Sequence, residues 1–373
     1  MLKLTPVCFA ALLLSQAPAA FAQNAGTTVA GQSLAAQIDA AIAPYFKPGD
    51  PGATIIVTRD GKRVFYKSYG LADVAKQQAM KLNMDFQVGA IAKQFAAAAI
   101  MLLVDDRQLA LDDDIRKYLP GFPDKGSKIT IEHLLTHTSG IVDHGAKPEH
   151  AGNAMNLAKT PAQLIATFKD DPLEFAPGSR SRYSDAGYVL LGAIIEKISE
   201  QPYAQFVAER IFVPLEMNDT ACDRHERAPR LPALPHVRSG DAASAWVAAP
   251  SMNMSQACAA GTLVSTIDDL AKWNRTISRG RLLRPASWAR VFTPFKLNNG
   301  EASNYGYGWE VGSLRGHALM SQGGAINGYS AYTMRLPQDR VDVAVLSNAD
   351  AGSGVTPPFE VASKAAAIAI GQP

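Results

Sequence analysis

The order of the predicted elements indicates an α/β (α+β) fold in which an antiparallel sheet is built from both ends of the chain. Residues 53–69 predict a β-hairpin, because β-branched and aromatic residues flank Asp60-Gly61, a pair that favours a tight turn. Residues from about 90 to 284 are mostly helical in pattern. Three later stretches alternate or run apolar and predict further strands, namely 305–311, 329–336 and 341–347. A sheet with flanking helices, plus an inserted and mostly helical part, explains this order.

Helix signals occur before, within and after the central region. Residues 34–45 have the spacing of an amphipathic helix, and 361–370 suit a closing helix. Thr160-Pro161 pairs an N-cap residue with a proline at the first helical position, and residues 265–269 offer a second capping sequence. We therefore expect one domain over residues 23–373, with its sheet part at about 33–89 and 285–373 and its helical part at about 90–284.

The first 22 residues have the character of a signal peptide. Lys3 supplies a positive start, residues 7–14 an apolar core, and Ala20-Phe21-Ala22 a cleavage site. The apolar run is far shorter than the roughly 20 residues that a membrane-spanning helix needs. We expect an exported protein, periplasmic or secreted, without a transmembrane span.

The composition is ordinary for a globular protein. Of the 373 residues, 47% are hydrophobic and 19% are charged. The net charge of +2 gives no case for nucleic acid, which would need a clustered basic face. Outside the predicted signal peptide the cysteines are Cys222 and Cys258. An oxidising compartment permits a bridge between them, and two buried free thiols fit equally well, since pairing cannot be deduced from sequence.

Several short stretches between about 52 and 350 are informative through their order along the chain. They include Lys93-Gln94-Phe95, Leu134-Leu135-Thr136-His137-Thr138-Ser139-Gly140, Tyr183-Ser184, Gly187-Tyr188, Leu263-Val264-Ser265-Thr266 and Asn327-Gly328-Tyr329. Together they resemble the serine β-lactamase and penicillin-binding-protein family, most closely its class C and esterase branch. The resemblance implies a sheet domain beside a helical domain, with the active site in the cleft between them. It implies acyl transfer to a serine and hydrolysis of an ester, amide or β-lactam, without a cofactor.

The first family motif, Ser-x-x-Lys, is altered in this chain. It reads Ala90-Ile91-Ala92-Lys93, so a methyl group stands in the position of the nucleophile. Residues three apart share a helix face, which is how the lysine reaches the hydroxyl to take its proton. The chain holds no other Ser-x-x-Lys and no Gly-x-Ser-x-Gly. The resemblance therefore places Lys93 in the position of the base and Ala90 in the position of the lost nucleophile, where it can play no catalytic role.

The other two motifs are altered as well. Tyr-x-Asn reads Tyr183-Ser184-Asp185, where the resemblance implies a proton-shuttle position for Tyr183. An ionised Asp185 only accepts hydrogen bonds, and a carboxylate near Lys93 would keep that lysine charged. Lys-Thr-Gly, or His-x-Gly, on a sheet-edge strand reads Gln322-Gly323-Gly324 and brings no charge. We expect the two glycines to allow a substrate or a helix to approach the strand closely.

Two histidines four residues apart, His133 and His137, could in principle hold a metal ion. No glutamate follows His133 as in His-Glu-x-x-His, and no third ligand is evident, so we predict no metal site. We interpret His137, within His-Thr-Ser-Gly, as a structural turn residue rather than a catalyst.

Three readings of the function follow. The chain is a natural pseudoenzyme that kept the fold and a ligand cleft, or it is an edited and disabled copy of an active hydrolase. The third reading is an active enzyme that uses another nucleophile, such as Tyr183 or a water activated by Lys93. The expected partner is a small-molecule carbonyl ligand or a cell-wall peptide.

Overall fold

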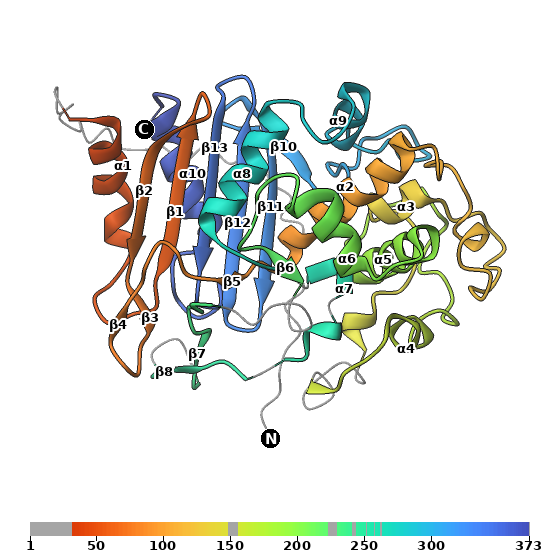
Figure 1. Cartoon of the computed structure of the whole chain (residues 1–373), viewed down its shortest axis with the longest axis horizontal. Helices are drawn as coiled ribbons and strands as arrows, with labels where there is room; N and C mark the ends of the chain where they lie inside the picture. The colour runs from red at the N-terminus through yellow and green to blue at the C-terminus, as the bar shows by residue number, and fades with distance from the viewer. Residues whose placement is uncertain are drawn as a thin grey trace.

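A computed structural model describes residues 32–147, 156–222, 230–240, 244–250, 252–256, 258–261 and 263–372. The predicted signal peptide lies outside these residues. Cys222 is buried, whereas the side chain of Cys258, the other cysteine considered for a bridge, is not described. The chain forms a six-stranded sheet with helices on both faces, and a group of helices beside one end of the sheet (Figure 1).

The main sheet is assembled from both ends of the chain, as predicted. Its order is β10-β11-β12-β13-β1-β2, and each neighbouring pair is antiparallel. Asp60 and Gly61 both have positive φ at the turn between β1 and β2, which confirms the predicted hairpin. The strands are β1 (Ala53–Arg59), β2 (Lys62–Tyr69), β10 (Glu310–Leu314), β11 (His317–Ile326), β12 (Tyr329–Leu336) and β13 (Val341–Ser347).

The strand predicted at 305–311 differs from the structure. β10 begins only at Glu310, because Gly308 has a φ of +74° that breaks the extended backbone. A side chain at Gly308 would place its Cβ 2.6 Å from the carbonyl oxygen of Lys93, so the chain passes close to α2 at this point. β11 was not expected from apolar alternation, since Ser321 and Gln322 precede two glycines in its middle.

Helices from distant parts of the chain cover the two faces of the sheet. On one face α1 (Leu34–Ile42) and α10 (Pro358–Ala369) pack against each other and bury the apolar residues of β1 and β13. On the other face α8 (Ile267–Ser278) packs against the same two strands. Every residue of β13 is buried, which explains the apolar run from Val343 to Leu346, and the buried Asp342 pairs with Arg335 of β12 at 2.9 Å.

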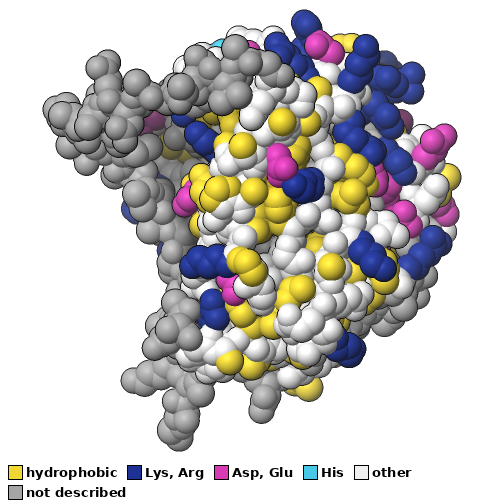
Figure 2. Space-filling view, turned by 90° about the vertical axis from the view of Figure 1, so that its left-hand side faces the viewer, with side chains coloured by type: hydrophobic (Ala, Val, Ile, Leu, Met, Phe, Trp, Pro, Cys, Tyr) yellow, Lys and Arg dark blue, Asp and Glu magenta, His cyan; other side chains and the backbone are white. Residues whose placement is uncertain are grey.

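The strand at the outer edge of the sheet, β2, carries charge. Lys62, Arg63 and Lys67 lie along it, and Lys67 pairs with Asp39 of α1. Figure 2 shows Lys and Arg side chains spread among hydrophobic ones on this side of the molecule. Charged side chains on an edge strand disfavour pairing with the edge of another sheet.

The remaining helices lie beside the β10–β11 end of the sheet (Figure 1). Helix α2 is alanine-rich and buried all round over residues 92–103, as expected for the centre of a helical group. No helix of the described ranges is long and apolar enough to cross a membrane. The helices are α2 (Ala92–Asp105), α3 (Ile131–Leu135), α4 (Pro161–Ala166), α5 (Asp185–Ser199), α6 (Tyr203–Val207), α7 (Cys258–Gly261) and α9 (Pro285–Val291).

Short strands join these parts of the chain. In the described ranges they form three small sheets. In the first, β3 (Leu71–Asp73) pairs with β4 (Gln78–Ala79), and in the second, β9 (Leu263–Ser265) lies between β5 (Phe86–Gln87) and β6 (Ala221–Cys222). In the third, β7 (His236–Arg238) pairs with β8 (Trp246–Ala248). The β5–β9 pair lies directly before the helical turn η2 (Gly89–Ile91), which leads into α2. It therefore fixes where Ala90 and Lys93 begin their helical segment.

Gly324 on β11 allows the helical turn η2 to lie close to the sheet. A Cβ added at Gly324 would lie 2.1 Å from the carbonyl oxygen of Val88 and 3.0 Å from the amide nitrogen of Ala90. A Cβ added at Gly323 would find its nearest atom 3.5 Å away, on the Tyr332 ring, which is ordinary contact. Gly324 provides the close approach of a helical segment that we expected, whereas at Gly323 no protein atom comes as close.

We predict that Gly324→Ala lowers the free energy of unfolding by about 2 kcal/mol or more, because η2 must move off the strand. Gly323→Ala is the matched control and should change it by less than about 1 kcal/mol. Urea unfolding of both variants and of the parent chain measures the difference. Equal losses in the two variants would contradict the proposed contact between η2 and β11.

Candidate active site

Lys93, from the first altered motif, contacts both Tyr183 and Asp185 of the second. Its side chain is fully buried in the first turn of α2. Its Nζ donates to Asp185 Oδ1 at 2.6 Å and to the carbonyl oxygen of Ala260 at 2.9 Å. Because a buried ammonium needs a charged or hydrogen-bonded partner, these two contacts keep Lys93 inside the protein.

Tyr183 and Asp185 reach Lys93 from the start of α5. The N-cap residue Ser184 makes no capping bond with its side chain. Asp143 takes that role, since its Oδ1 accepts from the backbone N–H groups of Asp185 at 2.8 Å and Ala186 at 3.2 Å. The Lys93 Nζ lies 4.8 Å from the centroid of the Tyr183 ring, within the range of a cation–π contact.

Ala90 lies on η2, half-buried, one turn before Lys93. Its backbone N–H has no acceptor within the described ranges. A Cβ added at Gly89 would lie 2.9 Å from the amide nitrogen of Ala325. A Cβ added at Gly324 would lie 3.0 Å from the amide nitrogen of Ala90. Two backbone N–H groups, of Ala90 and Ala325, therefore lie close together where η2 meets β11.

Gln322 faces the helical group and is buried. Its Oε1 accepts a hydrogen bond from the Tyr305 hydroxyl at 2.9 Å, and its Nε2 donates to the carbonyl oxygen of Gly323 at 2.8 Å. The Tyr305 ring lies 4.6 Å from the His137 ring, which lies 4.4 Å from the Tyr183 ring. Gln322 is thus linked to Tyr183 through two aromatic contacts rather than directly.

The structure therefore brings Lys93, Tyr183 and Asp185 into direct contact. Gln322 does not contact these three residues directly: it is hydrogen-bonded to Tyr305, whose ring contacts His137, and the His137 ring contacts Tyr183. Ala90 lies close to the backbone of β11 at Gly324. Three neighbours of the motif residues were not expected from sequence, namely Asp143, Tyr188 and Tyr305. The aromatic and glycine alternation at 305–309 is a signal that could have indicated Tyr305.

The two carboxyl groups of the cluster have opposite pKa shifts. Burial disfavours the charged form of Asp185, but the Lys93 ammonium outweighs burial and holds the pKa of this carboxyl below its usual value. Burial, and then the negative charge of Asp185, raise the pKa of Asp143. Tyr183 is partly exposed, but desolvation by the surrounding protein, and then the negative charge of Asp185, raise its pKa well above the usual value, so its hydroxyl stays protonated at neutral pH.

His137 is a neutral group in the midst of the cluster. Its φ is +59°, as suits a turn residue. Its Nδ1 accepts from the Ser184 N–H at 3.2 Å, which places the proton on Nε2. Burial, and next the charge of Lys93, lower the pKa of this imidazole to about 3. The imidazole is therefore neutral at neutral pH, which agrees with a structural role.

His133 has a local function. Its Nδ1 accepts from the backbone N–H of Thr130 at 3.2 Å, and the Thr130 hydroxyl accepts from the His133 N–H, so the pair caps α3. Across the described stretches, no three His, Cys, Asp or Glu side chains gather as a metal site would require.

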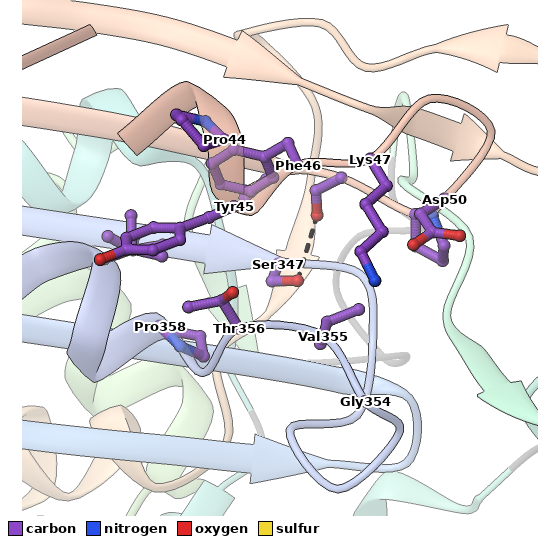
Figure 3. Close-up of a pocket in the computed structure, with 15 residues that line it drawn as sticks. Pro44, Tyr45, Phe46, Lys47, Asp50, Ser347, Gly354, Val355, Thr356 and Pro358 are labelled. Carbon is purple, nitrogen blue, oxygen red and sulfur yellow. Dashed lines mark hydrogen bonds between the residues drawn. The ribbon is translucent and has the colours of Figure 1, made fainter. Parts of the chain in front are cut away.

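A separate cavity of about 130 Å³ lies between the start of α10 and the loop after α1 (Figure 3). Tyr45, Lys47, Thr356 and Pro358 line it, together with Ser347, whose hydroxyl donates to the Gly52 carbonyl oxygen at 3.1 Å. None of the motif residues lines this cavity.

Comparison with known proteins places this arrangement in context. The family described as Beta-lactamase matches residues 38–366. Penicillin-binding protein 4* of Bacillus subtilis is 30% identical over 309 residues, which cover 79% of this chain and 67% of that protein. Two solved structures share the fold. An octameric penicillin-binding protein homologue from Pyrococcus abyssi has a TM-score of 0.77 and 28% identity, covering 91% of this chain and 77% of that one. A D-stereospecific amidohydrolase from Streptomyces sp. has a TM-score of 0.73 and 26% identity, covering 88% and 97%.

The neutral state of His137 predicts a loss of stability in acid. Unfolding returns the imidazole to its ordinary pKa near 6.5, so the unfolded chain binds the proton first. The stability that this neutral imidazole contributes is complete above about pH 6.5 and falls as the pH drops towards 3, by about 5 kcal/mol at most. His137→Asn, which tolerates the positive φ and does not titrate, should show a shallower fall. Urea unfolding at several pH values checks this, and equal slopes would contradict it.

Proposed function

The chain belongs to the beta-lactamase family of serine hydrolases, and on that premise we propose that it is an exported member that has lost acyl transfer and keeps its cleft as a ligand-binding site. The observation that carries the proposal is the residue at position 90. A side chain with no oxygen, sulfur or nitrogen stands one helical turn before the lysine. No covalent acyl intermediate can form on a methyl group.

The surroundings of Ala90 support the same proposal. In the family pattern the lysine takes a proton from the serine, but here the Lys93 Nζ already donates to Asp185 and to Ala260. The raised pKa of Tyr183 argues against a tyrosinate that could accept a proton or attack a carbonyl. These contacts disfavour the alternative in which Tyr183 or a water activated by Lys93 replaces the serine.

The parts of the cleft that need no side-chain chemistry support ligand binding. The backbone N–H groups of Ala90 and Ala325 would hold a carbonyl oxygen, as an oxyanion hole does in an active relative. β10 pairs with β11 only as far as Ser321, so β10 does not cover the outer edge of residues 322–326. We infer that a small carbonyl compound, or a cell-wall peptide laid along this edge, is the ligand.

We also propose that the protein is exported after cleavage of an N-terminal signal peptide. This proposal depends on Lys3, the apolar residues 7–14 and the Ala20-Phe21-Ala22 site. Mass spectrometry of the N-terminus after expression in a bacterium with a periplasm tests it, because cleavage leaves Gln23 first.

Reversion of the three altered motifs tests the loss of chemistry. We predict that the parent chain forms no adduct with a reactive penicillin by intact mass and hydrolyses p-nitrophenyl esters at background rate. Ala90→Ser should restore little hydrolysis, because Asp185 still holds Lys93. Ala90→Ser combined with Asp185→Asn and Gln322→His should restore far more, since groups that act as a unit are strongly non-additive.

Asp185→Asn with Gln322→His, without the serine, is the matched control and should stay inactive. Removal of the nucleophile in another serine hydrolase costs about 10⁶ in turnover. A stoichiometric adduct on the parent chain would overturn the proposal. A single revertant as active as the triple one would show that Asp185 and Gln322 are harmless.

A further inference from the structure

We propose that one edge of the main sheet attaches the protein to an anionic phospholipid surface. At this edge β1 ends, β13 begins and α8 ends. It carries exposed cations whose side chains form no ion pair and no hydrogen bond with another described residue, and we call this group the basic edge: Arg59, Lys62, Arg275, Arg279 and Arg281. None of the motif residues belongs to the basic edge, so the inference does not depend on the loss of acyl transfer.

The cations meet because α8 ends against the ends of two strands. The hydroxyls of Ser278 in α8 and Thr58 in β1 both donate to Oδ2 of Asp342 in β13, at 3.2 Å and 3.5 Å. Arg279 and Arg59 are the next residues of the chain after those two. Figure 1 shows the β1–β2 turn and the C-terminal end of α8 together at the upper edge of the sheet. Cations from two distant segments of the sequence therefore lie at one edge.

The acidic side chains beside the basic edge are already paired. Asp60, in the β1–β2 turn, pairs with Arg340. Asp268, in the first turn of α8, pairs with Arg63 at 2.8 Å. In Figure 2 the Lys and Arg side chains are densest toward the top, the end of the molecule at which the basic edge lies. The basic edge is thus left without counter-ions among the described residues.

Two members of the basic edge lie directly opposite each other. Arg59 and Lys62 are in register across the β1–β2 hairpin, and like charges in opposite positions destabilise a strand pair. The dipole of α8 favours a cation in its last turn, which accounts for Arg275, whereas Arg281 lies beyond that helix. Local stability therefore does not account for the whole group, and a negative surface would remove the repulsion within it.

A phospholipid surface fits the composition and the placement of the basic edge. Four of its five cations are arginines, whose planar guanidinium group binds phosphate oxygens through two parallel hydrogen bonds. The cations come from the ends of a hairpin and of a helix, so a flat array of phosphates meets both at once, whereas one acidic peptide strand would follow only one of them. Each Lys or Arg beside an anionic bilayer strengthens attachment by about fivefold.

Sedimentation with lipid vesicles tests the proposal on the chain that begins at Gln23, the form left by the proposed cleavage. We expect vesicles of phosphatidylcholine with roughly one third phosphatidylglycerol to bind the protein, and vesicles of phosphatidylcholine alone to leave it in solution. Raising the salt concentration from about 0.05 M to about 0.5 M should release the bound protein, because salt screens exposed charges.

Paired substitutions assign the attachment to the basic edge. Arg275→Gln with Arg279→Gln removes two cations of the α8 end, and Arg59→Gln with Lys62→Gln removes the two of the hairpin. Each pair should weaken binding to the anionic vesicles by about 25-fold, which is fivefold for each lost cation. A loss in both pairs is expected because a flat surface contacts the two segments together.

The matched control removes the same charge elsewhere. Lys128→Gln with Lys296→Gln alters two exposed lysines outside the basic edge and should change binding by less than about threefold. Thermal melting of every variant verifies folding, and exposed substitutions of this kind change stability little.

Several outcomes would overturn the proposal. Equal binding to the two kinds of vesicle, binding that high salt leaves unchanged, or no binding to either vesicle would each do so. A control variant that loses as much as the edge variants would show that net charge matters and its position does not. Fluorescence anisotropy with a labelled DNA duplex measures the rival partner, and a duplex bound more tightly than the anionic vesicles at the same salt would assign the basic edge to nucleic acid. None of these outcomes bears on the carbonyl-binding cleft.

Discussion

The burial of one ammonium group determines how the helices α2, α5 and α7 pack around the motif residues. Lys93 is enclosed by the alanine-rich helix α2, and its charge is tolerated only because α5 supplies Asp185 and α7 supplies the Ala260 carbonyl oxygen. The same contact fixes the start of α5, where Asp143 caps the helix in place of Ser184. Three helices, α2, α5 and α7, are thus held together by contacts of one buried side chain.

Where the motif residues meet the sheet, the geometry depends on the backbone and does not require a particular side chain at position 90. Gly324 lets η2 lie against β11, so the N–H groups of Ala90 and Ala325 stay close together whatever side chain position 90 carries. The early end of the β10 pairing leaves the neighbouring edge of β11 clear of that strand. Under the proposed function, binding and chemistry are separable in this fold: the backbone would support the first, and the altered side chains would remove the second.

Much of the fold follows from local sequence signals, and much of the site does not. The Asp60-Gly61 hairpin, β12 and β13 were predictable because turn residues and apolar runs act over a few positions. Local apolar alternation did not indicate β11, because Gln322 to Gly324 interrupt that pattern, and only the family resemblance placed these residues on a strand. The cap provided by Asp143 and the link from Tyr305 to Gln322 join residues 42 and 17 positions apart. Such contacts depend on tertiary packing, and a local sequence pattern cannot predict them.

The central claim is that Asp185 holds Lys93 away from the chemistry that a serine at position 90 would require. A crystal structure of Ala90→Ser at a resolution that places side-chain atoms tests it most directly. The account predicts that the Lys93 Nζ stays within about 3 Å of Asp185 Oδ1 and of the Ala260 carbonyl oxygen, as a hydrogen bond requires. A lysine turned from Asp185 to the introduced hydroxyl would contradict it, since the base would then be available as soon as the nucleophile returned.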